Sequence, residues 1–509
     1  MPLRKPLSKR AFAWPIKSRS SAPLAQLHLD SMQSVLVLLG LFGVVWFCHL
    51  MSVALTPPMD NIEQLVWSHA WQWGYHKHPP LPTWLLAVPA QLSGYSAMLT
   101  AVLGAACTLM SALIFWNLVR HIWGRPAAYV ALLAALCITF YNGRLNYYNH
   151  NTVLMLCVSL TVHCWWMILT TGRTRWWIAL GVAAGLGMLS KYQYLLVLGP
   201  SAVLVWQLKP WQNRQHLHGL AWAALTALLI FLPHLIWLLH QDLENSPIRY
   251  ALKTSRPTFL QGDGAHINTR LHSGLWLLDL LLNRCLPALL LLLSLKALSE
   301  PEQHSVTADK APVSGEQFLW LWGALPPLSI TLLGLMLGMD LQMQWGTAFA
   351  IWIVPVLMMF LGLHQRHICK PLTWLSLGLF TLIQSLLLLQ SYHTSFYGCC
   401  SHTAPHRWRM FDSQALANEL DASAREAAGG RFNIIVGPTT TAGAVALALP
   451  DKPKVLIDHN LHISPWIHPD ELHFSGVVEL WPPDTGPSDR TVLSSGWGWR
   501  IYAPATESP

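Results

Sequence analysis

The clearest deficit of this sequence is charge. Only 11% of the 509 residues are charged and 53% are hydrophobic, whereas soluble globular proteins carry about 25% charged residues. So little charge cannot cover the surface of a water-soluble protein of this size, which excludes an ordinary soluble enzyme and favours a body surrounded by lipid. The net charge of +8 is not gathered into a basic patch, so we expect no nucleic-acid partner.

Several patterns that bind metals or nucleotides are also missing. The nine cysteines show no CxxC or Cys/His zinc spacing, and most of them lie inside apolar runs. No acidic DxD pair and no phosphate-loop motif is present. We therefore expect neither a metal ion nor a cofactor. The basic N-terminal stretch lacks a cleavage site, so the apolar run that follows it predicts a retained first helix.

Long apolar stretches are abundant, and a membrane-spanning helix needs about 20 mostly apolar residues. They predict an α-helical polytopic membrane protein with about eleven transmembrane helices. The expected helices lie near residues 34–55, 97–119, 126–141, 152–170, 175–190, 193–207, 219–240, 273–298, 317–338, 346–363 and 372–391.

The bias of Lys and Arg toward alternate short connectors predicts the orientation. It places residues 1–33, a basic arm, in the cytoplasm and residues 34–391 in the membrane. The loop at 56–96 and the tail at 392–509 then face outward. We expect a multi-pass protein of the bacterial inner membrane, with its tail in the periplasm.

The tail at 392–509 is polar enough to be a small soluble α/β domain. Two short apolar strands flank a helix of small residues, which is typical of a strand–helix–strand unit. The expected elements are helices at 411–426 and 441–449 and strands at 433–436, 454–457 and 477–480. The turn at 437–441 could bind an anion at a helix start, but it lacks a phosphate-loop lysine, and a structural role is favoured.

Residues able to carry chemistry gather in the loop at 56–96. Asp60 and Glu63 stand three residues apart, which puts both carboxylates on one face of a helix. Spacing alone leaves two readings of Asp60 open, a helix cap after Pro57-Pro58 or a catalytic base. Four groups able to bind a substrate follow: Tyr75, His76, Lys77 and His78. A carboxylate can accept a proton from an acceptor hydroxyl and cations can stabilise a departing phosphate, so the loop suits a phosphorylated, sugar-bearing lipid.

The stretch PPMDNIEQLVWSHAWQWGYHKHPPLPTW at 57–84 resembles the bacterial membrane glycosyltransferases of family 39. That family is related to protein O-mannosyltransferases and to the aminoarabinose transferases that modify lipid A. The likeness continues in NGRLNYYNHNTVLML at 142–156 and LSKYQYL at 189–195, and covers about the first 210 residues. The resemblance implies a type C glycosyltransferase fold, a polyprenyl-phosphate sugar donor and inverting transfer. It also implies that Asp60 is the base or positions the acceptor.

One departure from the family concerns the second outward loop. Many relatives carry a further Asp there, whereas this chain reads Asn149-His150-Asn151. These three side chains could hydrogen-bond a sugar, and either His150 or Glu63 could replace the missing acid.

Lysine and arginine on the outward side run against the charge bias. Lys191, which is followed by Tyr192, could snorkel to the interface or contact the donor phosphate, and we favour the phosphate. The same reasoning applies to Arg144. The basic loop at 241–272 could be a mobile lid over the donor or a solvated surface loop, and the sequence does not decide between them.

The sequence as a whole predicts a membrane glycosyltransferase that uses a polyprenyl-phosphate sugar. The acceptor hydroxyl would belong to lipid A, another envelope glycan or a protein. The alternatives are a non-enzymatic lipid-linked sugar flippase, which would need polar residues along the middle of several spans, and a scaffold whose tail binds a partner.

Overall fold

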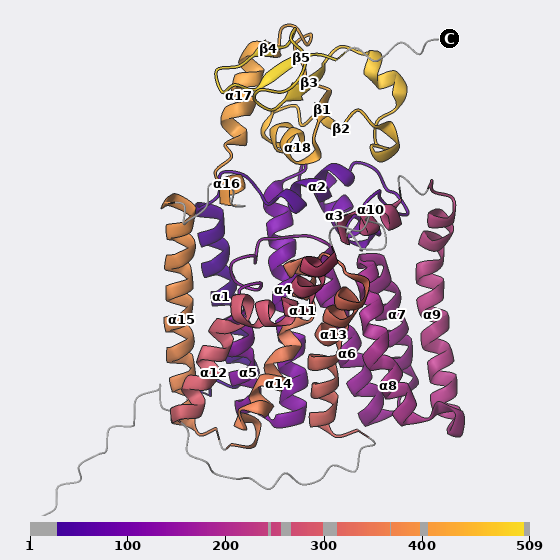
Figure 1. Cartoon of the computed structure of the whole chain (residues 1–509), viewed down its shortest axis with the longest axis vertical. Helices are drawn as coiled ribbons and strands as arrows, with labels where there is room; N and C mark the ends of the chain where they lie inside the picture. Colours follow the sequence, from indigo (N-terminus) through magenta and orange to yellow (C-terminus); the bar gives the residue numbers. More distant parts are fainter. Residues whose placement is uncertain are drawn as a thin grey trace, which may run out of the picture.

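The computed structural model describes residues 28–242, 246–255, 266–298, 313–366, 368–397 and 406–502. A long helical body carries a smaller α/β domain at one end (Figure 1). Most of the predicted N-terminal arm lies outside the described residues.

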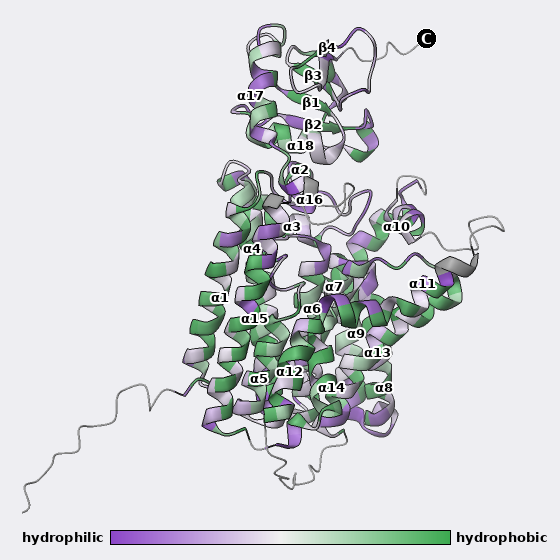
Figure 2. Cartoon of the chain, turned by 60° about the vertical axis from the view of Figure 1, so that its left-hand side comes forward, coloured by the Kyte–Doolittle hydropathy of each residue, from purple (hydrophilic) through white to green (hydrophobic). Residues whose placement is uncertain are grey.

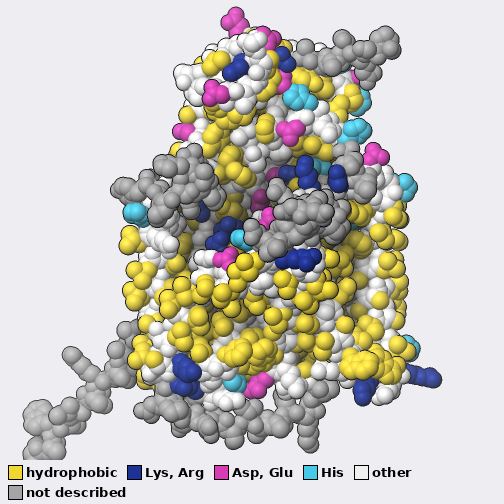
Figure 3. All heavy atoms as spheres, viewed as in Figure 1, with side chains coloured by type: hydrophobic (Ala, Val, Ile, Leu, Met, Phe, Trp, Pro, Cys, Tyr) yellow, Lys and Arg dark blue, Asp and Glu magenta, His cyan; other side chains and the backbone are white. Residues whose placement is uncertain are grey.

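Within the described residues, six helices are long and apolar enough to cross a membrane, and a bent pair adds a possible seventh. The six are α1 (Met32–Ser52), α4 (Ala97–Trp123), α6 (His150–Thr171), α9 (Arg214–Leu239), α13 (Gly315–Leu337) and α15 (Lys370–Tyr397). In the bent pair, α11 (His266–Asp279) and the π-helix η6 (Leu280–Arg284) meet α12 (Leu286–Leu298) at 67°. The helices of the body are mostly hydrophobic (Figure 2), and hydrophobic side chains cover much of the face of the body seen in Figure 3. The predicted multi-pass helical membrane fold is confirmed.

The other predicted spans correspond to shorter helices, so the count of eleven stays a prediction. These are α5 (Arg125–Leu136), α7 (Thr174–Ser190), α8 (Leu198–Leu208) and α14 (Ala350–Phe360). Glycines let α7 pack closely on α9, because a Cβ at Gly181 would lie 2.4 Å from the carbonyl oxygen of Ala223. Small residues serve the same purpose at many membrane helix contacts.

Short helices and turns lie in the segments that connect the longer helices. The loop at 56–96 forms α2 (Met59–Trp67) and α3 (Leu81–Leu92), and α10 (Pro247–Ser255) follows α9. The 3-10 turns of the body are η2 (Tyr192–Val197), η3 (Pro210–Gln212), η7 (Met343–Gly346) and η8 (Leu363–Gln365). Figure 3 shows Lys and Arg side chains at the end of the body opposite the α/β domain. Which end faces the cytoplasm stays a prediction.

The C-terminal domain is a five-stranded sheet with the strand order β2-β1-β3-β5-β4. Strand β1 is parallel to β2 and β3, and β5 is antiparallel to β3 and β4. The predicted strand–helix–strand unit and third strand are present, and two further strands were not predicted. The elements are α16 (His406–Arg409), α17 (Ser413–Ala424), β1 (Ile434–Gly437), α18 (Thr439–Ala448), β2 (Lys454–Ile457), η9 (Leu461–Ile463), η10 (Pro469–His473), β3 (Val477–Trp481), β4 (Thr491–Val492) and β5 (Gly498–Ile501).

The domain shares its hydrophobic core with α2. Ile62 and Val66 are buried together with the side chains of the domain. A Cβ at Gly443 of α18 would lie only 2.6 Å from Ile62 Cγ2, so only a residue without a side chain fits there. Trp408 Nε1 also donates to the Pro57 carbonyl at 2.8 Å. Helix α2 is therefore held between the membrane body and the C-terminal domain.

Candidate active site

Asp60 stands in the first turn of α2 but does not cap it. The N-cap residue is Pro58, and no side-chain hydrogen bond caps the helix. The capping interpretation of Asp60 is therefore wrong. Its side chain is exposed, and a carboxylate in the first turn interacts favourably with the helix dipole.

Asn149 holds the Asp60 carboxylate from the start of α6. Its Oδ1 accepts hydrogen bonds from the backbone N–H groups of Asn151 at 2.9 Å and Thr152 at 3.0 Å, which caps α6. Its Nδ2 donates to Asp60 Oδ2 at 2.7 Å. Because the α6 cap fixes the amide oxygen, the amide nitrogen must face Asp60. This hydrogen bond fixes one carboxylate oxygen, so Asn149 orients the Asp60 side chain.

The neighbouring residue fixes the position of α2 itself. The amide of Asn61 is fully buried and donates to Thr100 Oγ1 and to the Asn146 carbonyl, both at 2.8 Å. Its oxygen accepts from the Tyr148 backbone N–H at 2.9 Å. Helix α2 is thus tied to α4 and to the loop that leads to Asn149.

Glu63 lies on the same side of α2 and forms an ion pair with Lys77. The side chains are 11% and 26% exposed. Burial lowers the pKa of Lys77, but the adjacent Glu63 carboxylate outweighs this and the net shift is upward. Lys77 therefore stays cationic, and its ammonium lies 5.6 Å from the centre of the Tyr250 ring. A carboxylate held by a cation is poorly placed to accept a proton, so Glu63 as a second acid remains only a prediction.

Lys191 extends from the end of α7 toward the same region. Its Nζ donates to Asn151 Oδ1 at 2.7 Å, and Trp345 lies below it with its ring centre 5.9 Å away. Burial lowers the pKa of Lys191 to about 8, while Asp60 acts in the opposite direction. Among the described residues, Lys191 forms no ion pair within 4.0 Å. Its charge is therefore free to meet an anionic ligand.

Two histidines, His78 and His150, lie beside these charged groups. The ring centres of His78 and His150 are 3.9 Å apart. Burial, together with His150 and the nearby lysines, holds the pKa of His78 well below its usual value, so His78 is neutral. His150 Nε2 is buried without a hydrogen-bond partner in the described part of the chain.

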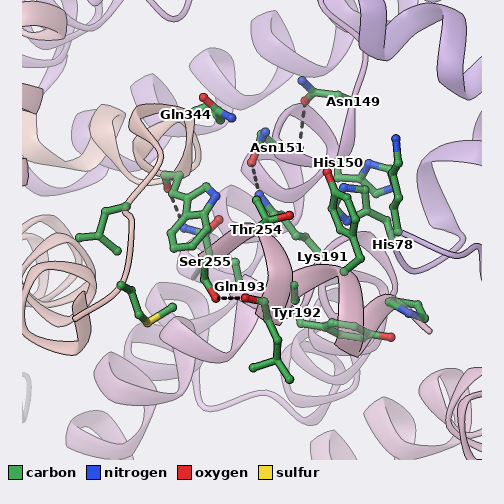
Figure 4. Close-up of a pocket in the computed structure, with 18 of the residues that line it drawn as sticks. His78, Asn149, His150, Asn151, Lys191, Tyr192, Gln193, Thr254, Ser255 and Gln344 are labelled. Carbon is green, nitrogen blue, oxygen red and sulfur yellow. Dashed lines mark hydrogen bonds between the residues drawn. The ribbon is translucent and has the colours of Figure 1, made fainter. Parts of the chain in front are cut away.

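A cavity of about 700 Å³ joins these groups. Nine of the twelve predicted residues line it, namely Asp60, Glu63, Lys77, His78, Asn149, His150, Asn151, Lys191 and Tyr192. Figure 4 shows Asn151, from the first turn of α6, and Lys191, from the end of α7, pointing toward one another. Apolar side chains form another part of the lining and include Leu195, Leu196, Ile330, Leu333 and Leu337. The cavity therefore combines a charged wall with a surface suited to a lipid chain.

Three predicted residues lie outside the cavity wall. Tyr75 stacks on Trp67 with ring centres 5.1 Å apart and donates to the Ala70 carbonyl. His76 contacts the edge of the same indole, and burial lowers its pKa to about 3. Arg144 lies over another aromatic ring, farther along the chain. Their roles in substrate binding stay predictions, and the contacts of Tyr75 and His76 support the α2–α3 loop.

The sequence did not point to several residues that the cavity does include. Gln193 donates to the Trp345 carbonyl at 2.7 Å, and its place inside the SKYQY stretch was a usable signal. The others are Tyr250, Gln344, Trp345 and Thr440. Tyr250 lies in the possible lid at 241–272 and Thr440 in the turn at 437–441, although neither residue was named from the sequence. Helix α10, from the predicted lid at 241–272, also lines the cavity. Residues 243–245 and 256–265 of that loop lie outside the described residues.

Part of the sequence matches known proteins and one protein family. Residues 77–237 match the dolichyl-phosphate-mannose-protein mannosyltransferase family. The lipopolysaccharide core galacturonosyltransferase RgtA of Rhizobium johnstonii is 27% identical over 187 residues, which are 35% of this chain and 36% of RgtA. The undecaprenyl phosphate-alpha-4-amino-4-deoxy-L-arabinose arabinosyl transferase of Pseudomonas aeruginosa is 29% identical over 168 residues, which are 31% of this chain and 30% of that protein. Each match thus spans well under half of the relative's own length.

The structural likeness is more extensive. The crystal structure of ArnT from Cupriavidus metallidurans bound to undecaprenyl phosphate has a TM-score of 0.61 at 14% sequence identity. The match covers 92% of this chain and 98% of ArnT. The chain therefore has the type C glycosyltransferase fold, and the resemblance expected from the first-loop motif is confirmed.

Proposed function

We propose that this protein transfers a sugar from a polyprenyl-phosphate carrier to an acceptor hydroxyl at the periplasmic face of a bacterial inner membrane. One observation supports this most strongly. A single cavity combines the Asp60 carboxylate, the ammonium of Lys191 and an apolar part of the lining. These are the three groups that such a reaction needs: a proton acceptor, a partner for phosphate and a surface for the lipid.

The donor would lie with its isoprenoid chain along the apolar part of the lining formed by η2 and α13. Its phosphate would meet Lys191, with Lys77 nearby on the α2–α3 loop. Because burial lowers the pKa of Lys191, binding of an anion beside it would favour the protonated lysine. Lys191 is thus suited to respond to a phosphate rather than to serve as a permanent structural charge.

The chemical step would occur at the anomeric carbon, on the side away from the phosphate. The acceptor oxygen forms a bond to this carbon as the bond from the carbon to the phosphate oxygen breaks, which inverts the configuration. Asp60 Oδ1 is the oxygen without the Asn149 contact, so it would take the hydroxyl proton. The polyprenyl phosphate leaves as an anion that Lys191 stabilises.

Transfer can be tested with purified protein in lipid nanodiscs. The assay supplies synthetic undecaprenyl-phosphate sugars labelled in the sugar, together with an envelope glycolipid and glycan extract. We expect a labelled product and equal release of undecaprenyl phosphate. Mass spectrometry of envelopes with and without the gene should show the same added mass. If the donor crosses the membrane of proteoliposomes and no glycosidic product forms, the protein is a flippase instead. If the protein binds no carrier-linked sugar at all, a scaffold is indicated.

A further inference from the structure

Three arginines from distant parts of the chain meet at the loop between α5 and α6. Arg144 belongs to this loop. Arg284 lies at the break between α11 and α12, where its carbonyl accepts from the Thr139 backbone N–H at 3.1 Å. Arg409 ends α16, and its Nη2 donates to the Gly143 carbonyl at 3.1 Å. None of the three lines the cavity that contains Lys191.

Their charges are poorly compensated. Among the described residues, none of the three forms an ion pair with a carboxylate. The guanidinium groups of Arg144 and Arg284 lie close enough to repel each other, and Asp279 is the acid within electrostatic reach of Arg284. The Nε of Arg284 is also buried without a hydrogen-bond partner in the described part of the chain. Such an arrangement is costly unless an anion joins it.

The position of Arg284 also favours a functional role. It ends a π-helical turn in a pair of apolar helices bent by 67°. π-Helical turns are frequent at functional sites, and an ionisable residue within a membrane-spanning segment is a functional candidate by default. Its guanidinium carbon lies 5.2 Å from the centre of the Phe140 ring, which keeps the group directed toward the α5–α6 loop.

Two segments of the chain link the three arginines, here called the arginine cluster, to Asp60. The Arg409 carbonyl accepts from the Leu55 backbone N–H at 2.7 Å, just before α2 begins. In the second segment, the loop that contains Arg144 leads within five residues to Asn149, which holds the Asp60 carboxylate. Asp60 thus connects to the arginines through α2 and the α5–α6 loop, whereas Lys191 meets it inside the cavity.

We propose that Arg144, Arg284 and Arg409 bind a phosphate monoester carried by the acceptor glycolipid. This inference rests on the proposed function, because it takes Asp60 as the point where the acceptor hydroxyl reacts. Guanidinium groups present planar pairs of N–H donors that match phosphate oxygens. The donor phosphate and the acceptor phosphate would then have separate cationic partners, Lys191 for the donor and the arginine cluster for the acceptor.

The test measures binding of two lipids to protein in phosphatidylcholine nanodiscs. One probe is a lipid-linked glucosamine disaccharide with a phosphate monoester, compared with the same lipid bearing a hydroxyl instead. The other probe is undecaprenyl phosphate. We expect Arg144→Gln and Arg284→Gln each to weaken binding of the phosphorylated disaccharide by about tenfold or more, and to leave undecaprenyl phosphate binding unchanged. Lys191→Gln should do the reverse, and inorganic phosphate should compete for the arginine cluster.

Controls separate a lost contact from a damaged fold. Arg144→Lys keeps the charge and should retain part of the affinity, and Arg173→Gln at the opposite end of the body should bind both probes normally. If Arg284→Gln does not fold, the two Arg144 variants decide the question. Equal binding of the phosphorylated and hydroxyl disaccharides, or equal loss of both lipids in Arg144→Gln, would overturn the inference. Binding of the phosphorylated disaccharide without any sugar transfer would keep this site and refute the proposed function instead.

Discussion

Replacing Asp60 with Asn removes the proposed proton acceptor while changing the fold very little. The side chain is exposed, and the amide of the variant can still accept the hydrogen bond from Asn149 through its oxygen. The variant loses a first-turn charge, worth about 0.3–1 kcal/mol at a helix N-terminus. It also converts a charge-assisted hydrogen bond into a neutral one, which adds about 1 kcal/mol. We therefore expect the free energy of unfolding to fall by no more than about 2 kcal/mol.

The effect on transfer should be much larger. General base catalysis contributes about 10²–10⁴-fold to rate, which corresponds to roughly 2.7–5.5 kcal/mol of activation free energy. The assay is the initial rate of sugar transfer in nanodiscs, normalised to folded protein measured by tryptophan fluorescence on heating. Binding of undecaprenyl phosphate should stay within about twofold of wild type, because Lys191 remains in place.

A matched control distinguishes lost chemistry from lost helix stability. Glu316 is also an acid in the first turn of a helix, and its carboxylate likewise contacts one polar neighbour, His364, at 3.2 Å. Glu316→Gln should cost similar stability and retain the wild-type rate. If Asp60→Asn transfers sugar at the wild-type rate, or loses only as much rate as Glu316→Gln, the assignment of Asp60 as the base is wrong.

Two further variants test other groups of the cavity, and a third tests the packing behind α2. Because burial lowers the pKa of Lys191 to about 8, its cation is lost as the pH rises through that value. The affinity of the wild-type protein for the donor should fall over the same pH interval, whereas the affinity of Lys191→Arg should not depend on pH there. If Lys191→Arg shows the same pH dependence as the wild type, the proposed contact with the phosphate is wrong. Lys77→Met leaves Glu63 buried and unpaired, so thermal unfolding should show a loss of roughly 3 kcal/mol, most of which the double variant with Glu63→Met recovers. A single variant as stable as wild type would show that the ion pair is dispensable. Gly443→Ala places a methyl group against α2 and should cost about 1–3 kcal/mol and reduce transfer. Gly378→Ala, which meets open space, is the matched control, and equal effects of the two changes would contradict the role of the α18–α2 contact.

The residues of the α2–α3 segment that line the cavity could be picked out from the sequence because their signals are local. Asp60, Glu63, Lys77 and His78 stand out as ionisable residues at the end of an apolar run, and chain connectivity alone keeps them close together. The contacts between loops could not be predicted in this way. The sequence predicted Asn149 only as a group that could hydrogen-bond a sugar, and its contact with Asp60 depends on how α2 packs against the start of α6.

The number of membrane-spanning helices was harder to predict from the sequence for a related reason. Hydropathy scores an apolar residue equally in a helix and in a turn beside a cavity. Residues 346–363 read as one span, yet α14 occupies only Ala350–Phe360, because the chain before it forms η7 and brings Trp345 to the cavity. Arg284 illustrates the same limit, since only the three-dimensional break between α11 and α12 brings it to Arg144.

The C-terminal domain bears on the chemistry because one face of α2 belongs to its core. Ile62, Val66 and Trp67 are buried in that core, while Asp60 and Glu63 line the cavity. Removing the domain would expose these apolar side chains to water, at a cost of about 25 cal/mol for each Å² uncovered. Helix α2 would then lose the surface that sets the position of Asp60. Loss of transfer after such a truncation would therefore not show that the domain contacts substrate. The Gly443→Ala variant tests only whether the packing of α18 on α2 matters for transfer, because it leaves every side chain that lines the cavity unchanged.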